Sequence, residues 1–173
     1  TLENEYLKQL FDKESLEKFV EKLHNEASRF EHIVYDIGFG LGDSLLYSAR
    51  SHPHQLIVGF DPHPNGSAKI LQQNEKGLLN NILIYQGDCL DLLSMNPCGL
   101  PKANSVHIFF PDPWPKTRHH KRRLIQIAFL EQLASHLQPG GVIHIATDWA
   151  DYASHIFNMV KNSPLKLLAK DSP

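Results

Sequence analysis

The stretch FFPDPWPKTRHHKRR, residues 109–123, gathers residue types that suit contact with a nucleic acid. One carboxylate, Asp112, stands between two prolines, and the indole of Trp114 follows it. Five of the seventeen lysines and arginines fall within residues 116–123, although the formal net charge of the chain is only −2. Cations at this density suit the phosphates of a polyanion. They are Lys116, Arg118, Lys121, Arg122 and Arg123.

Asp112 and Trp114 together suit the recognition of guanine. A base that stacks on an aromatic side chain gains about 1–3 kcal/mol in single-strand binding. The carboxylate accepts hydrogen bonds from the N1–H and the exocyclic amine of guanine, whereas adenine offers only one such donor. Pro111 and Pro113 restrict the backbone around Asp112, which reduces the entropy that its positioning costs.

Both features also have purely structural explanations. Trp114 is also explained as a core residue that anchors its loop, and the basic run as the solvated start of a helix. The second explanation is weakened by position, because cations at a helix N-terminus oppose the helix dipole. We therefore expect an anionic partner to compensate the basic run.

A glycine-rich loop, YDIGFGLGDS at residues 35–44, follows an apolar run and precedes a helical pattern. Gly38 lets the chain turn, while Gly40 and Gly42 allow a ligand close to the backbone. A dinucleotide fingerprint needs a third glycine at position 43, but Asp43 stands there and would repel a pyrophosphate at the helix N-terminus. The loop therefore favours S-adenosylmethionine, which carries adenosine without phosphate, over a nicotinamide dinucleotide; a plain tight turn is the alternative explanation.

Three more acids stand at or near the carboxyl ends of apolar runs. Asp61 comes 19 residues after Gly42 and is placed to accept both ribose hydroxyls, and Asp88 to receive an adenine amino group. Asp36 precedes the loop and is placed to meet the ammonium of the methionine part. Each has a simpler explanation as a helix cap, above all Asp88 before CLDLL. Their shared place is where open α/β sheets bind ligands.

The elements that position these residues alternate along the chain. Nearly continuous apolar runs predict buried parallel strands, and the periodic segments between them predict helices on both faces. The sequence thus predicts a doubly wound α/β fold in a single domain, residues 1–173, with a helical lead-in over 1–31. Strands are predicted over 32–40, 55–61, 81–88, 105–112, 142–148 and 165–170, and helices over 12–30 (capped by Asp12), 43–52, 65–77 (closed by Gly77), 122–141 and 149–162.

Composition excludes several classes. With 42% hydrophobic and 21% charged residues the chain is typical of a globular protein, and no apolar run reaches the ~18 residues of a membrane span. Cys89 and Cys98 form neither a disulfide framework nor a zinc site, and the histidines are scattered. We expect no metal, a cytoplasmic location, and a monomer or homodimer.

The motifs DIGFGLGDS, FFPDPWPKTRHHKRR and ATDW, in this order, resemble the bacterial tRNA (guanine-N7)-methyltransferase family over residues 33–160. The resemblance implies a Rossmann-like class I methyltransferase that moves a methyl group from S-adenosylmethionine to a variable-loop guanine of tRNA. It implies a cofactor site lined by Asp36, Asp61, Asp88 and Asp112, with Asp112 also catalytic. Lys116 and Asp148 would contact substrate, and residues 118–123 would meet the RNA.

The sequence departs from the family pattern in two places. The family has Glu where this chain has Asp36, whose shorter side chain would reach the cofactor through water. The family also continues into a TKFE-like substrate motif that these 173 residues do not contain, so we expect the last strand pair of the sheet to be missing.

Two alternatives to the guanine-N7 activity follow from the same residues. PDPW resembles the D/N-P-P-aromatic loop that holds an exocyclic amine, although Trp114 occupies the place of the second proline. A non-catalytic RNA-binding module on an S-adenosylmethionine-binding fold is the other alternative.

Overall fold

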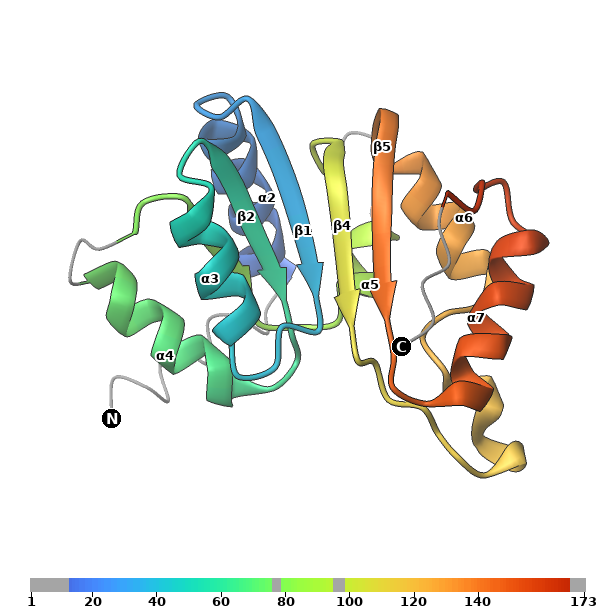
Figure 1. Ribbon diagram of the computed structural model, residues 1–173. Helices are drawn as coiled ribbons and strands as arrows, with labels where there is room; N and C mark the ends of the chain where they lie inside the picture. The colour runs from blue at the N-terminus through green and yellow to red at the C-terminus, as the bar shows by residue number, and fades with distance from the viewer. Residues whose placement is uncertain (1–12, 76–78, 95–98, 169–173) are drawn as a thin grey trace.

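The sheet of the computed structural model, which describes residues 13–75, 79–94 and 99–168, has five parallel strands in the order β3-β2-β1-β4-β5. Figure 1 shows the arrows of β1, β2, β4 and β5 pointing the same way. The strands are His32–Ile37 (β1), Gln55–Phe60 (β2), Ile82–Tyr85 (β3), Ala103–Phe109 (β4) and Leu137–Ala146 (β5).

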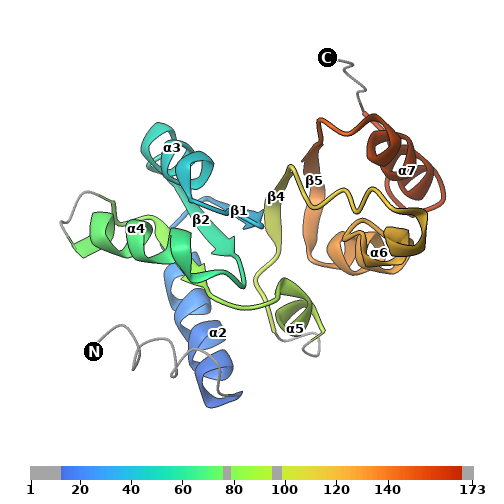
Figure 2. The same ribbon diagram turned by 90° about the horizontal axis from the view of Figure 1, so that it is seen from below.

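Helices cover both faces of this sheet, as the sequence predicts, because its strands carry apolar side chains on both sides. Figure 2 shows α3 on one side of the strands and α2 and α5 on the other. Side chains of α3 and α4 pack in one apolar cluster, and those of α2, α5, α6 and α7 in a second, larger one. The helices are Lys13–Ala27 (α2), Asp43–Ser51 (α3), Pro64–Glu75 (α4), Cys89–Leu93 (α5), Ile127–Ser135 (α6) and Ala150–Lys161 (α7), with a 3₁₀ helix, η1, at Thr117–Arg122.

The predicted helix over 122–141 is wrong at both ends. Residues 117–122 form η1, and Arg123 to Gln126 separate it from α6, so the cations do not stand at the N-terminus of a long helix. The dipole argument against a solvated basic run therefore fails. At the other end α6 stops at Ser135, and QPGG is part of β5.

The strand tolerates Pro139 because the pairing with β4 shifts there: Ala103 pairs with Leu137, and Ser105 pairs with Val142. Gly140 takes a positive φ of 79° inside this irregularity. Within the described part of the chain β5 is an edge strand, where a missing N–H is least costly.

The other predicted boundaries agree to within a few residues, with two exceptions. The strand predicted from residue 142 begins at Leu137. Leu165 to Leu168 belong to no strand, so the start of the predicted sixth strand is wrong. The rest of that strand, the cap at Asp12 and the stop at Gly77 lie outside the described residues. Among the described residues, no helix has both the length and the apolar character that crossing a membrane requires.

Candidate functional site

The carboxyl ends of the five parallel strands form one rim, and each strand delivers an acid there. In sheet order these are Asp88 after β3, Asp61 after β2, Asp36 at the end of β1, Asp112 after β4 and Asp148 after β5. Strand order reverses between β1 and β4, which pair directly. Open α/β sheets bind ligands at such a point. The rim therefore brings together the glycine loop of β1 and the Asp112 loop of β4.

The glycine loop has the conformation that the sequence predicts. Gly38, Gly40 and Gly42 have φ values of 76°, 55° and 80°, which other residues rarely adopt. A Cβ on Gly42 would lie 2.8 Å from Cδ1 of Ile70, so the loop packs tightly against α4 there. At Gly38 and Gly40 a Cβ would meet no atom within 4 Å, so this part of the loop has an open side.

Asp61 holds the glycine loop in place. One carboxylate oxygen accepts the N–H of Gly40 at 2.8 Å, and the other accepts the N–H of His63 at 2.8 Å. The side chain is buried. Asp61 thus fixes the backbone of the glycine loop, and the ribose role that the sequence predicts stays a prediction.

Gly66, near the start of α4, packs directly against the backbone of the glycine loop at Gly40. Sequence analysis did not single out this residue. A Cβ on Gly66 would collide with the carbonyl oxygen of Gly40. We expect Gly66→Ala to displace the loop, to weaken cofactor binding about tenfold and to cost about 1–3 kcal/mol of stability. Calorimetric titration and thermal unfolding measure the two effects. Ala68→Gly, at an exposed position in the same helix, is the control for a change of helix propensity; unchanged cofactor affinity in Gly66→Ala would contradict the loop's role.

Asp36 is the most unusual acid of the rim. It is 2% exposed, and its Oδ2 atom has no hydrogen-bond partner. Burial raises the pKa of this carboxyl to about 7, and the charge of Asp61 adds to the effect. A buried acceptor without a partner is costly, and a cationic ligand group would satisfy it.

Asp88 caps helix α5, which confirms the helix-cap explanation that the sequence offers for this residue. Its Oδ1 atom accepts the N–H of Leu90 at 2.9 Å, and the side chain is exposed at the rim. Such a cap leaves a carboxylate lone pair for a ligand, because each oxygen accepts more than one hydrogen bond.

The Asp112 loop leaves β4 in a constrained conformation. The N–H of Phe110 still bonds the carbonyl of Ala146 at 2.8 Å, which ties the start of the loop to the end of β5. Phe110 and Trp114 have φ values of 53° and 43°, rare for residues other than glycine. Between them Asp112 is exposed, and on the neighbouring strand end so is Asp148.

Trp114 is half-buried, and two side chains of the basic run contact its ring. The guanidinium of Arg122 lies 5.0 Å from the ring centroid, and His119 meets the ring edge-on at 5.8 Å. Lys116, Arg118, Lys121 and Arg122 are exposed. These four cations therefore form a basic surface next to Trp114.

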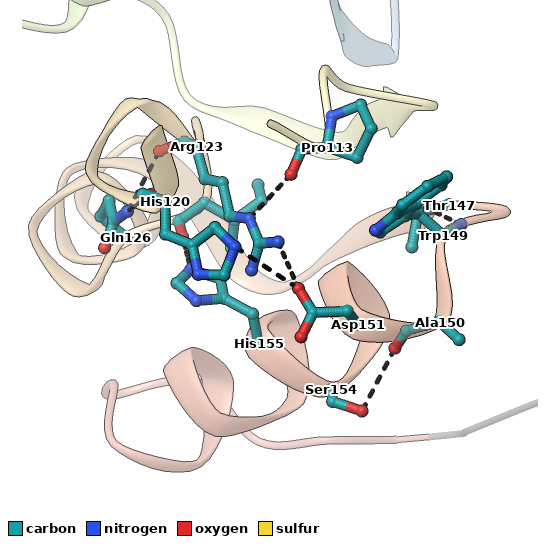
Figure 3. Close-up of polar contacts among 11 residues, drawn as sticks. Pro113, His120, Arg123, Gln126, Thr147, Trp149, Ala150, Asp151, Ser154 and His155 are labelled. Carbon is teal, nitrogen blue, oxygen red and sulfur yellow. Dashed lines mark hydrogen bonds and ion pairs between the residues drawn. The ribbon is translucent and has the colours of Figure 1, made fainter. Parts of the chain in front are cut away.

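Arg123 does not belong to that surface. It is 3% exposed, its Nε donates to the carbonyl of Pro113 at 2.8 Å, and its Nη2 pairs with Asp151 (Figure 3). The prediction that Arg123 contacts RNA does not fit this burial. Arg123 stands directly before an apolar segment, LIQIAFL, but no local pattern in the sequence marks it as buried.

Comparisons with known proteins show the family to which this chain belongs. Residues 30–172 match a family described as "Putative methyltransferase". The chain belongs to this methyltransferase family. Two similar curated proteins are both named tRNA (guanine-N(7)-)-methyltransferase: that of Nitrosospira multiformis is 45% identical over 131 residues, and that of Thiobacillus denitrificans is 46% identical over 123 residues. These stretches cover 75% and 71% of the chain but 56% and 54% of the relatives, so the chain spans about half their length.

Solved structures show that the methyltransferase fold is shared more widely than the sequence. A 16S rRNA (adenine(1408)-N(1))-methyltransferase mutant with cosubstrate SAM, from Catenulisporales acidiphilia, superposes with a TM-score of 0.58 at 20% identity, covering 86% of this chain and 71% of that one. A precorrin-6y C5,15-methyltransferase from Geobacter metallireducens gives 0.58 at 14% identity, covering 88% and 70%.

The chemistry available at this methyltransferase rim follows from its donor set. Carboxylates, backbone N–H groups, an indole and arginines suit a cationic cofactor and a nucleic acid. Among the described residues, no three histidines, cysteines or acids gather as a metal site would require.

Proposed function

We propose that this chain transfers a methyl group from S-adenosylmethionine to nitrogen 7 of a guanine in tRNA, in the cytoplasm. The observation that carries the proposal is the pairing of β1 with β4, because the glycine loop that follows β1 and the Asp112 loop that follows β4 then leave neighbouring strands at the same rim of the sheet. The names of the curated relatives support the choice of tRNA and of nitrogen 7.

The residues of the rim fit S-adenosylmethionine. The open side of Gly38 and Gly40 accommodates a ligand against the backbone, and the unpartnered oxygen of Asp36 suits its ammonium group. Asp61 and Asp88 keep lone pairs for the ribose hydroxyls and the adenine amine. The bound cofactor supplies an electrophilic methyl group.

Asp112 would act on the guanine without removing a proton from the nucleophile. Nitrogen 7 carries a lone pair and no proton, so no general base is needed, and the purine gains positive charge as it reacts. The exposed carboxylate of Asp112 would accept the N1–H and the amine of guanine. It would thereby orient the ring on Trp114 and stabilise the growing charge, and Asp148 would assist from the end of β5.

The exposed cations beside Trp114 would bind tRNA phosphates. We expect the double variant Lys121→Ala with Arg122→Ala to raise the Kd for tRNA about tenfold and to reduce the slope of log Kd against log salt by about two. Filter binding over a range of salt concentrations measures both.

The matched control is Arg50→Ala with Lys102→Ala. It removes the same two charges at exposed positions near the amino ends of the strands, away from the rim. Equal effects of the two double variants would assign the basic run to a solvated surface.

The proposed function is tested by supplying labelled S-adenosylmethionine and bulk tRNA and then analysing the nucleosides. Label in 7-methylguanosine is the expected result. Label on an exocyclic amine of adenine or cytosine would favour the PDPW-type alternative. Tight tRNA binding without transfer would indicate the non-catalytic module.

A further inference from the structure

A buried guanidinium joins the Asp112 loop to helix α7. Arg123 donates through Nε to the carbonyl of Pro113 and through Nη2 to the carboxylate of Asp151 in the first turn of α7. The side chain of Arg123 is 1% exposed, whereas that of Asp151 is 60% exposed. Figure 3 shows the guanidinium between Pro113 and Asp151. Both bonds come from one rigid planar group, so they fix the loop and the helix relative to each other.

Neighbouring contacts strengthen the same connection. The guanidinium carbon lies 4.9 Å from the ring centroid of Tyr152, whose hydroxyl oxygen accepts the N–H of Ile125 at 3.2 Å. His155 bonds the carbonyl of Ile125 at 2.8 Å. The His120 Nε2 atom lies 3.7 Å from Asp151. The segment after the loop is therefore held to α7 over several residues.

The carbonyl that Arg123 holds belongs to the peptide between Pro113 and Trp114. Trp114 has a φ of 43°, a conformation that a residue with a side chain keeps only when its surroundings enforce it. Asp112, the proposed catalytic residue, directly precedes Pro113 in the chain. Arg122, next to Arg123, points instead to the indole of Trp114. Two adjacent arginines thus have different surroundings, one inside the loop and one on its outer surface.

We propose that the Arg123–Asp151 pair is a positioning device that orients the Pro113 carbonyl and so presents Asp112 and Trp114 to the substrate. Arg123 and Asp151 act through these residues and do not touch the substrate. The expected loss of kcat rests on the proposed function. The expected change in the conformation of the loop rests on the loop geometry alone.

Asp151→Asn is the main test variant, because the exposed asparagine still accepts a hydrogen bond but no longer pairs with the buried charge. We expect kcat to fall about tenfold while KM for tRNA changes by less than about twofold. Arg123→Lys keeps the charge but replaces the planar fork by one ammonium group, whose three donors share a single position and do not reproduce the separate Nε and Nη2 contacts. We expect a similar loss. The double variant is expected to lose no more than either single variant, since the two residues act as a unit.

The control is Asp91→Asn, which removes an exposed acid from the first turn of another helix, α5, and is expected to leave kcat unchanged. A second readout follows the loop without any turnover. In a Trp149→Phe background Trp114 is the remaining tryptophan of the two in the sequence, and its quenching by acrylamide reports its exposure. We expect Asp151→Asn and Arg123→Lys to raise the quenching constant about twofold, and Asp91→Asn to leave it unchanged.

The outcomes separate the two proposals. Unchanged kcat and unchanged quenching in Asp151→Asn would overturn the positioning role, as would a loss of kcat that tracks the unfolding temperature while quenching stays constant. If the unmodified protein transfers no methyl group, the proposed function fails, and the quenching experiment still decides whether the pair holds the loop.

Discussion

Replacing Asp112 by alanine is expected to lower methyl transfer by about a hundredfold to a thousandfold, the range seen when one preorganised electrostatic contact is lost. The affinity for S-adenosylmethionine should stay within a few-fold, because the glycine loop, Asp36 and Asp61 are untouched. The physical reason is that alanine removes the acceptor for the guanine Watson–Crick edge and the negative charge next to a purine that becomes cationic. Single-turnover kinetics together with calorimetric titration of the cofactor measure the two quantities.

Asp112→Asn is the matched control for this prediction. The amide keeps one acceptor oxygen but has no charge and adds a donor, so its rate is expected to fall between that of the unmodified protein and that of Asp112→Ala. Turnover that is unchanged in Asp112→Ala would end the catalytic assignment. A loss of cofactor affinity as large as the loss of rate would assign Asp112 to the cofactor site alone.

Asp36→Asn is expected to make the protein more stable and the cofactor bind more weakly. The pKa of Asp36 in the folded protein is raised to about 7 by burial and by Asp61, whereas in an unfolded chain it is about 4. Between these values the folded state retains a proton that the unfolded state releases. The free energy of unfolding therefore falls as the pH rises from about 4 to about 7, by up to about 1.4 kcal/mol per pH unit.

Asparagine carries no charge at any of these pH values, so the Asp36→Asn variant does not lose this part of its free energy of unfolding as the pH rises. At pH 8 we expect Asp36→Asn to raise the free energy of unfolding by about 2–4 kcal/mol, measured by denaturant titration. Cofactor affinity should fall about tenfold, because the ammonium group loses its ionised partner. In the unmodified protein the same affinity should increase with pH up to about 7, as the carboxylate ionises.

Asp61→Asn is the control for the stability effect. Asp61→Asn is expected to destabilise the protein at pH 8, because Asp61 accepts two backbone N–H groups that an amide satisfies less well. An Asp36→Asn variant that is less stable than the unmodified protein at pH 8 would contradict the burial argument. A cofactor affinity that does not change with pH would contradict the ion pair with the ligand.

The strand ends were predictable from the sequence, and so were the acids on them. Asp36, Asp61 and Asp88 each stand at the end of an apolar run, and the carboxyl ends of parallel strands must meet at one edge. The glycine loop was also predictable, since three glycines within five residues indicate a turn that other residues rarely adopt.

Contacts between distant residues were not predictable in this way. Asp61 bonds Gly40, 21 residues away, and Arg123 pairs with Asp151, 28 residues away; no local pattern encodes either contact. The start of the helix predicted over 122–141 was wrong because Leu124 and Ile125 continue the apolar spacing of α6 toward the basic run, although the helix begins only at Ile127. Gln126, whose amide donates to the carbonyls of His120 and Arg123, marks the break between η1 and α6.

The central claim is that the guanine base binds at the junction of β1 and β4, stacked on Trp114 with its Watson–Crick edge at Asp112. A crystal structure of the protein with S-adenosylhomocysteine and guanosine monophosphate tests this most directly. The account predicts the base on the indole and both of its edge donors within hydrogen-bond distance of the Asp112 carboxylate. A base bound elsewhere on the protein, or an Asp112 side chain directed away from it, would contradict the account.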